Sequence, residues 1–468
     1  MWTKDAKGRY TYYNYDSRGN MTYMKDAEGN ETTYEYDSSG YLISQTQCGV
    51  TTTYTNDAMG NRLTETKPAP ANIGGVVTTK YEYDANGRLV KTIYPDGTFT
   101  ETVYDSLGKP IVRVDQKGRE TETVYDDMGR PWKVTYPDGN YEITEYDAEG
   151  RKIKLTQYYS DMSMRETRYE YDDMGRQTRV IYPDGLSSIT HYDSQGRVDY
   201  EIDEQGVMTE YEYDFAGRRT KMRRGGITTT YGYDENGNQT SVTDNKGRTT
   251  YTDYDELNRA WRVRYPNGTS KTFEYDKLGR KVAEVDEAGK RTEFGYDCLG
   301  CLTSVKDAMN SVTSYGYDFA GNMVIQTDAL NRVTRYEYDE MNRRKKRILP
   351  GGQEEEYGYD EVGNMVRKRN FNGQMITYTY HIATDRLLSK IVPGYGTVTY
   401  VYDAKGRRQS MTDASGTTTY NYDVRDRMVT KTTPFGTLTY TYTNGLDTYQ
   451  VKCVSHIYYD SQGRVVNR

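Results

Sequence analysis

The feature that most constrains this chain is a tandem repeat with a period close to 21 residues. The dipeptide Tyr-Asp occurs 19 times in 468 residues, and between Tyr83 and Tyr359 most copies are 21 residues apart. Degenerate copies at 56–57, 380–381 and 442–443 extend the series to about 22 units. A chain built in this way folds as an array of similar small units rather than around one central core.

The spacing predicts a single continuous array over residues 1–468. Residues 1–80 are expected to hold N-terminal repeats with one longer loop, 81–360 regular 21-residue repeats, and 361–468 degenerate C-terminal repeats. Because no Ser- or Pro-rich linker interrupts the series, the sequence gives no reason to expect separate domains.

Each unit carries two turn signals. The first follows the dipeptide in the pattern YDxxGR, and the second comes about ten residues later as YPDG or DxxG. An Asp at the first turn position accepts a hydrogen bond from a backbone N–H two residues on, and Gly or Asn supplies a positive φ. We expect this structural turn signature at Tyr83, Asp84, Gly87 and Arg88, at Tyr125, Asp126, Gly129 and Arg130, and at Tyr275, Asp276, Gly279 and Arg280.

Between the turns, side chains alternate with period 2. In TTYEYD (32–37), Thr32, Tyr34 and Tyr36 share one face, whereas Thr33 and Glu35 share the other. One unit is therefore strand, turn, strand, turn, and about 22 units give about 44 short strands. Since open twisted sheets rarely exceed about 10 strands, this sheet is expected to spiral or close. The predicted fold is all-β, with tandem β-hairpin repeats in a spiralling sheet that forms an open or partial hollow shell.

Composition agrees with this fold and excludes several classes of protein. The 51 Tyr supply most of the large apolar surface and favour strands, whereas a Leu-rich helical core is excluded. No window approaches 18 apolar residues and the start lacks an apolar signal segment, so neither a transmembrane helix nor a signal peptide is expected in this chain. A net charge of −7 with intermixed Lys and Arg argues against nucleic-acid binding.

With YDxxGR at a 21-residue period and YPDG or DxxG as the second turn, the chain resembles the RHS/YD-repeat family. That family includes bacterial Rhs polymorphic toxins, insecticidal toxin-complex components and the teneurin YD shell. The resemblance covers nearly the whole chain and implies a β-sheet wound into a hollow cocoon. In bacteria the cocoon encloses a C-terminal toxin, whereas in teneurins it is an extracellular scaffold.

The chain departs from family toxins, because it contains neither their repeat-associated core motif nor their autoproteolytic aspartate site. The resemblance therefore implies a noncatalytic structural shell segment that encapsulates or presents a toxin or effector module absent from this chain. Its expected partners are the remainder of a longer Rhs-like polypeptide or toxin cargo, with end-to-end self-association as a further expectation. The expected location is extracellular or cell-surface. The alternative function is an adhesin-like module that binds glycans or another cell's surface.

No residue pattern indicates an enzyme, a cofactor or a metal site. Cys298 and Cys301 form a CxxC, but Cys48 and Cys453 are isolated in the sequence, so the pair is interpreted as incidental, with local redox or metal roles as alternatives. The DxxG turns lack the oxygen spacing of a Ca²⁺ loop. The three His lie at positions 191, 381 and 456, and no local signature gives any of them a nucleophile.

Two charged features are interpreted as architectural. The acidic pairs 126–127 and 172–173 are expected in turns that face water. The basic run 343–347 precedes the acidic run 354–356, which indicates a hairpin with opposite charges facing each other across strands. A docking patch is the alternative for the basic run.

Overall fold

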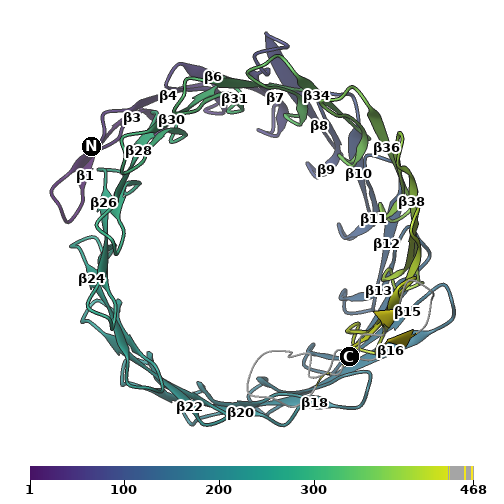
Figure 1. Ribbon diagram of the computed structural model, residues 1–468. Helices are drawn as coiled ribbons and strands as arrows, with labels where there is room; N and C mark the ends of the chain where they lie inside the picture. The colour runs from purple at the N-terminus through teal and green to yellow at the C-terminus, as the bar shows by residue number, and fades with distance from the viewer. Residues whose placement is uncertain (441, 443–457, 460–464, 467–468) are drawn as a thin grey trace. The chain divides into compact units, whose positions relative to one another are not determined.

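The computed structural model describes residues 1–440, 442, 458–459 and 465–466. All regular secondary structure in these residues is β-strand: 42 strands belong to one sheet and two form a separate pair (Figure 1). The prediction of an all-β array of hairpins in one spiralling sheet is confirmed.

The first 21 strands have these bounds: β1 Trp2–Lys4, β2 Tyr10–Tyr15, β3 Met21–Lys25, β4 Glu31–Tyr36, β5 Leu42–Gln47, β6 Val50–Asn56, β7 Arg62–Pro68, β8 Val76–Tyr83, β9 Leu89–Ile93, β10 Phe99–Tyr104, β11 Pro110–Val114, β12 Glu120–Tyr125, β13 Pro131–Thr135, β14 Tyr141–Tyr146, β15 Lys152–Tyr158, β16 Met164–Tyr171, β17 Gln177–Ile181, β18 Ser187–Tyr192, β19 Val198–Ile202, β20 Met208–Tyr213 and β21 Arg219–Arg224.

The remaining strands are β22 Ile227–Tyr233, β23 Gln239–Thr243, β24 Thr249–Tyr254, β25 Ala260–Arg264, β26 Ser270–Tyr275, β27 Lys281–Val285, β28 Arg291–Tyr296, β29 Leu302–Lys306, β30 Val312–Tyr317, β31 Met323–Thr327, β32 Val333–Tyr338, β33 Arg344–Ile348, β34 Glu354–Tyr359, β35 Met365–Arg369, β36 Met375–Tyr380, β37 Leu387–Val392, β38 Gly396–Tyr402, β39 Arg408–Asp413, β40 Gly416–Tyr422, β41 Met428–Thr433, β42 Gly436–Thr439, β43 Tyr458–Tyr459 and β44 Val465–Val466.

Neighbouring strands in the chain pair antiparallel along the large sheet, as the two-turn repeat requires. In a representative unit, β12 pairs with β13 through Glu122↔Thr135 and Thr123↔Val134, and a bulge falls between Val124 and Tyr125. A bulge directly before the Tyr of the dipeptide recurs at 15, 36, 83, 125, 146, 171, 192, 213, 233, 254, 275, 296, 317, 338, 380, 402 and 422. Such a bulge bends the strand and increases its twist, so each unit contributes an increment of curvature.

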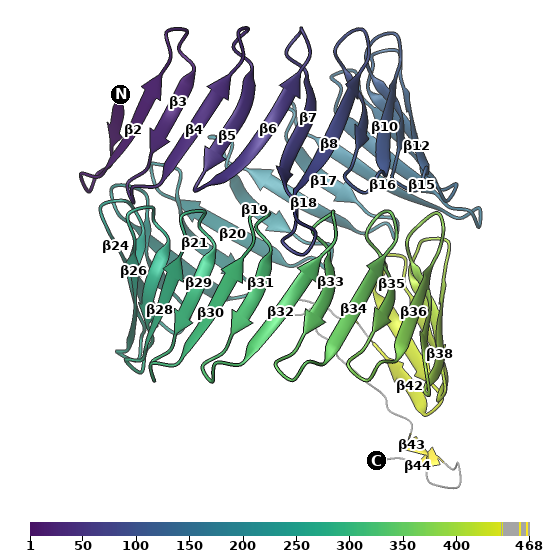
Figure 2. The same cartoon turned by 90° about the horizontal axis from the view of Figure 1, so that it is seen from above.

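The chain divides into two compact units, each built from an early and a late part of the sequence. Unit 1 comprises 1–102, 230–363 and 368–373, and unit 2 comprises 103–229, 364–367 and 374–468. We name 1–102 and 103–229 the early runs, and 230–363 and 374–439 the late runs. In unit 1, Figure 2 shows β2 to β7 of the early run in one row and β28 to β33 of the late run in a second row beside it.

Few side chains are fully buried, because a single layer of sheet has no second layer against which to pack. Among the described residues the buried apolar ones are Ala69, Pro70, Ala283, Tyr336 and Tyr338, and most other Tyr are half-buried. Thr supplies several of the buried polar positions, for example Thr32 at 2% exposure. Stability in such an array comes from repeated local contacts rather than from one central core.

Candidate functional site: the Tyr-Asp turns

The Tyr-Asp turn is one hydrogen-bonded unit centred on its Asp carboxylate. In the turn after β12, one oxygen of Asp126 accepts hydrogen bonds from the backbone N–H of Met128 (3.0 Å) and of Arg130 (2.8 Å). The N–H of Gly129 donates to the Asp126 carbonyl at 2.8 Å, and the φ of Gly129 is +80°. The same contacts form around Asp84 and Asp276, so all three signature sets lie in equivalent turns.

The Arg that closes YDxxGR joins one repeat to the next, a role that sequence reasoning missed. Nε of Arg130 donates to the second Asp126 oxygen at 2.7 Å, and a terminal nitrogen donates to the carbonyl of Asp147 at 3.2 Å. Its guanidinium lies 4.5 Å from the ring centroid of Tyr146. Arg280 makes the equivalent contacts with Asp276, Asp297 and Tyr296. The recurrence of Arg at this position of the repeat is the sequence signal that could have indicated this role.

The Tyr of each dipeptide forms a hydrogen bond back to the preceding repeat. The Tyr125 hydroxyl donates to the Pro110 carbonyl at 2.8 Å, and the Tyr275 hydroxyl donates to the Ala260 carbonyl at 2.7 Å. Each acceptor lies at the start of the strand that leaves the preceding Tyr-Asp turn. Adjacent turns are thus linked twice, by Arg reaching forward and Tyr reaching back, in a ladder along one edge of the sheet.

Replacing Arg130 by Met is expected to lower the free energy of unfolding by about 1–2 kcal/mol, because it removes two charge-assisted hydrogen bonds and a cation–π contact at a partly exposed site. Arg130→Lys is the matched control, since Lys109 already occupies this position one repeat earlier, 5.2 Å from the Tyr125 ring. Urea unfolding monitored by circular dichroism measures both variants. Equal midpoints for wild type and Arg130→Met would show that the ladder is not stabilising.

Hydrogen bonds lower the pKa of several of the turn carboxyl groups. For Asp126 the largest contribution comes from the backbone N–H of Arg130, and for Asp84 it comes from the Arg88 guanidinium. At Asp255 burial opposes the shift, but hydrogen bonds from Arg259 and Lys7 outweigh it, so that pKa is also lowered. The array therefore favours ionised carboxylates at many turns at once.

Stability is expected to fall at acid pH. A group whose pKa is lower in the folded state stabilises the fold above its unfolded pKa, about 3.9 for Asp, and loses that contribution as the pH falls through the folded value. Urea midpoints should be nearly constant between about pH 7 and 5 and should drop below about pH 4. A midpoint that rises between pH 4 and 2.5 would contradict the lowered pKa values.

Within each unit, the early and late runs meet through two different kinds of turn. We call the turn at the other end of each hairpin, which is YPDG or DxxG in most repeats, the distal turn. In unit 1, Lys7 of an early distal turn lies 2.8 Å from Asp255 of a late Tyr-Asp turn, and the Glu28 carboxylate accepts from the Lys277 backbone N–H at 2.7 Å. The long loop 66–80 belongs to the same series, since the Asn72 side chain donates to the Tyr338 carbonyl at 2.8 Å.

Unit 2 follows the same rule. Asp385 lies between Lys117 (2.7 Å) and Arg119 (2.6 Å), which come from an early distal turn. Arg425 in a late Tyr-Asp turn pairs with Asp184 (2.5 Å) and Glu204 (2.8 Å) of early distal turns. The partners are separated by roughly 220–270 residues, or about 10 to 13 repeats, as expected of a sheet that returns alongside itself.

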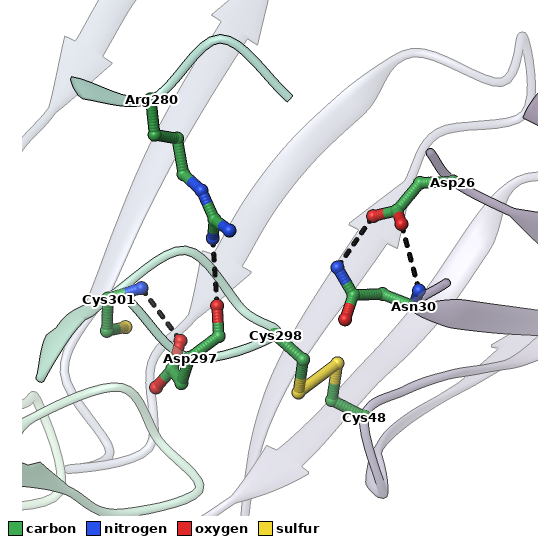
Figure 3. The surroundings of a disulfide bond; sticks show 7 residues. All are labelled: Asp26, Asn30, Cys48, Arg280, Asp297, Cys298 and Cys301. Atoms are coloured by element: carbon green, nitrogen blue, oxygen red, sulfur yellow. Dashed lines mark hydrogen bonds between the residues drawn. A yellow bond between two sulfur atoms is a disulfide. The ribbon is translucent and has the colours of Figure 1, made fainter. Parts of the chain in front are cut away.

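The interpretation of the cysteines as isolated was wrong for Cys48. Cys48 in an early distal turn forms a disulfide with Cys298 in a late Tyr-Asp turn, with their Cα atoms 6.1 Å apart (Figure 3). The 250-residue separation falls within the range of the other contacts between runs, and sequence reasoning lacked that offset. Cys301 is a half-buried thiol whose pKa is raised by burial, and Cys453 lies outside the described residues.

The other candidate residues have structural contacts. The His191 ring stacks on Tyr200 at 4.6 Å, and its Nδ1 lies 3.1 Å from the Asp199 carboxylate. His381 accepts a hydrogen bond from the Ala383 N–H within its own turn. His456 lies outside the described residues. These contacts orient the imidazole rings of His191 and His381.

The two charged features differ in outcome. In the basic and acidic runs, Arg347 faces Glu355 across β33 and β34, and Lys346 lies 2.6 Å from Glu354, so the expected cross-strand pairing is present. The interpretation of both acidic pairs as facing water was wrong for their first members. Asp126 is held inside its turn at 20% side-chain exposure, whereas Asp127 is exposed.

In the described residues, no cluster of three or more His, Cys, Asp or Glu has the arrangement of a metal site. The described part of unit 2 contains a cleft of about 300 Å³ between its runs. Tyr136, Tyr141 and Tyr158 line the cleft together with acidic, amide and Arg386 side chains, and the rings of Tyr141 and Tyr158 stack at 4.6 Å.

Comparison with known families agrees with this geometry. The teneurin YD-shell family model matches residues 2–137 and 199–350, which is more than half of the chain. The chain belongs to the YD-shell family. The RHS repeat model matches residues 402–438 of this YD-shell chain as well. The turns of Asp84, Asp126 and Asp276 lie within the matched residues.

Solved structures with the same fold come from toxin complexes. The crystal structure of TcdB2-TccC3-Cdc42 matches with a TM-score of 0.63 and 16% identity over 99% of this chain and 35% of that one. TcdB2-TccC3 matches with a TM-score of 0.58 and 17% identity, over 99% of this chain and 33% of that one. The Tc holotoxin pore of Photorhabdus luminescens matches with a TM-score of 0.56 and 15% identity, over 97% of this chain and 27% of that one. This YD-shell chain therefore spans about a third or less of the length of these structures.

The search of curated proteins found no significant match. Among the described residues, no helix has the length and apolar character needed to cross a membrane.

Proposed function

We propose that this chain is a noncatalytic wall segment of a longer Rhs-type surface or secreted protein, which encloses or presents a toxin or effector module. The single observation that carries the proposal is the double linkage of the Tyr-Asp turns, along the sheet by Arg and Tyr and between runs by the distal turns. Such repeated contacts build an extended wall, and they use the Asp, Arg and Tyr side chains of the turns for architecture.

Two further observations support a role as part of a toxin protein. The structures with the same fold include a Tc holotoxin pore, and this chain corresponds to between 27% and 35% of the matched chains. The partner is then the rest of a longer polypeptide or its cargo, and the location is extracellular or the cell surface. The absence of cofactors and of enzyme activity remains a prediction.

Sequencing the DNA on both sides of this reading frame tests the proposal. The expected result is further in-frame 21-residue repeats, followed by a repeat-associated core, a toxin module and a separate immunity gene. A self-standing gene among genes for carbohydrate uptake, with no further repeats, would overturn it. Loss of a robust hydrolytic activity on His191→Ala would overturn the noncatalytic part.

The alternative function, recognition of glycans, is favoured by one observation. The cleft in unit 2 combines four Tyr with Asp138, Asn140, Glu142 and Gln157, and aromatic faces beside polar groups suit the apolar and hydroxyl faces of a sugar ring. A glycan array probed with wild type and Tyr136→Ala tests it, and Tyr251→Ala, an exposed Tyr outside the cleft, is the control. Binding that Tyr136→Ala abolishes and Tyr251→Ala preserves would support this alternative.

A further inference from the structure

Three cysteines come together where the early and late runs of unit 1 meet. Cys48 and Cys298 form the disulfide between the runs, and Cys301 follows Cys298 in the same Tyr-Asp turn (Figure 3). Cys301 is half-buried and is a free thiol. The disulfide therefore has a thiol in the same turn as one of its two sulfurs.

Neither Cys48 nor Cys301 is the residue that its turn favours. Cys48 begins the two-residue turn between β5 and β6 at a φ of +52°, a position where Asn, Asp or Gly is usual. Cys301 occupies the position that Arg280 holds one repeat earlier. It keeps the backbone hydrogen bond to Asp297 (2.8 Å), but a thiol cannot make the guanidinium contacts of Arg280. Turn formation does not explain why these two positions hold cysteine.

The turn that carries Cys298 and Cys301 brings the two residues close enough for a local disulfide. The Gly300 N–H donates to the Asp297 carbonyl at 3.1 Å, and the Asp297 N–H donates to the Cys301 carbonyl at 3.0 Å. Because the chain folds back here, the two Cα atoms lie well inside the roughly 11 Å that three extended peptide units would span. The CxxC spacing is also the one found in redox-active disulfides. Cys298 thus has a second disulfide partner within its own turn.

We propose that Cys301 exchanges with the disulfide between the runs and makes it a reversible latch. The Cys301 thiolate attacks Sγ of Cys298, so that a Cys298–Cys301 bond forms and the Cys48–Cys298 bond breaks. The electron pair of the broken bond leaves on Sγ of Cys48, which takes up the proton that Cys301 gave to solvent. No external oxidant or reductant is consumed. This inference goes beyond the proposed shell function, because it depends on three cysteines and not on a cargo.

The noncovalent contacts beside the latch decide which bond is favoured. The Glu28 carboxylate accepts from the Lys277 N–H at 2.7 Å, and the Arg9 guanidinium donates to the Asp276 carbonyl at 3.0 Å. While such contacts hold the runs together, the bond between the runs is restored. When the runs part, the short local loop is favoured, because the entropy cost of closing a loop rises with its length. The latch therefore opens as the runs separate and closes as they meet.

The rate of exchange follows the ionisation of the Cys301 thiol. Burial, together with the Asp297 carboxylate, raises the pKa of this thiol. The other titratable groups around the turn are Arg280 and Tyr317 in the adjacent repeats and Asp26 in the early run (Figure 3). Since the thiolate is the attacking species, the rate should rise about tenfold per pH unit below that pKa. At neutral pH the exchange is slow, and the bond between the runs persists without reductant.

The first experiment tests whether the turn can hold the local bond. Cys48→Ser in a Cys453→Ser background leaves Cys298 and Cys301 as the only cysteines. Oxidised glutathione should join them in the folded chain, so that maleimide labels neither residue while circular dichroism remains that of an all-β protein. If both thiols stay open to maleimide, or if a mixed disulfide with glutathione persists, the product of the exchange does not form and the proposal is overturned.

The second experiment follows the exchange in Cys453→Ser protein without reductant or denaturant. Samples held at about pH 7, 8 and 9 are quenched with acid, labelled with maleimide, digested with trypsin and analysed by mass spectrometry. Before exchange, peptide 26–62 is linked to peptide 292–306 and Cys301 carries the label. After exchange, Cys48 carries the label and peptide 292–306 holds an internal bond. Labelled Cys48 should accumulate about tenfold faster at each step in pH, at a rate independent of protein concentration.

Cys301→Ser in the same background is the matched control, because it keeps the bond between the runs and removes the attacking thiol. Its Cys48 should stay unlabelled at every pH. Glu28→Ala removes a contact beside the latch and should raise the final labelled fraction of Cys48.

Four outcomes would overturn the proposal. Cys48 that stays unlabelled at the highest pH shows that the thiol does not reach the bond. Equal labelling in Cys301→Ser shows that another reaction breaks the bond. A rate that rises with protein concentration shows exchange between chains. A final labelled fraction that Glu28→Ala leaves unchanged shows that the exchange is not coupled to separation of the runs.

Discussion

Removal of the Cys48–Cys298 disulfide is expected to lower the free energy of unfolding by about 2–4 kcal/mol, the range usual for native disulfides. The bond joins residues 250 apart, so it restricts the unfolded chain over more than half of its length. It also fixes an early distal turn to a late Tyr-Asp turn, and the other contacts between the runs of unit 1 are hydrogen bonds and ion pairs. The double variant Cys48→Ser/Cys298→Ser measures the effect by urea unfolding.

Cys301→Ser is the matched control, because it removes the neighbouring thiol of the CxxC and leaves the bond between runs intact. Its midpoint should equal that of the wild type in the absence of reductant. With reductant present, the wild type should shift to the midpoint of the double variant. Equal midpoints for oxidised wild type and the double variant would show that the disulfide does not hold the runs together.

Gly129→Val is expected to destabilise the fold by about 1–3 kcal/mol, because Gly129 has a φ of +80° and a β-branched residue strongly disfavours that conformation. The new side chain would also meet Lys109, whose flexible end can move aside, so the backbone conformation dominates. Gly87→Val, at φ +74° and with Asn61 and Met59 in ordinary contact at 3.5 Å, should cost a similar amount. Thermal or urea unfolding measures both.

Gly129→Asn is the control for this prediction. Asn258, Asn331 and Asn342 already occupy the equivalent position of other turns with φ of 59°. The Asn variant should therefore keep most of the stability that Val loses. If the Val and Asn variants both melted at the wild-type temperature, the stability of the turn would not depend on the positive φ of Gly129.

Much of the local fold could be predicted from the sequence, because its causes are local. Asp126 and Gly129 define a turn through hydrogen bonds that span at most four residues, and alternating side chains between turns define strands. The repeat carries this information about 20 times, so single degenerate copies do not obscure it. The role of Arg130 was missed although it is nearly local, since its partner Asp147 lies 17 residues ahead.

The sequence by itself determined the strand-turn-strand unit, its 21-residue period and the all-β class, because these depend on residues within one repeat. Only the tertiary structure decided which repeats meet, since the offset of about 250 residues depends on small bends that accumulate over about 12 hairpins. No single repeat encodes the accumulated bend of the sheet. For this reason Cys48 and Cys298 looked unrelated in the sequence.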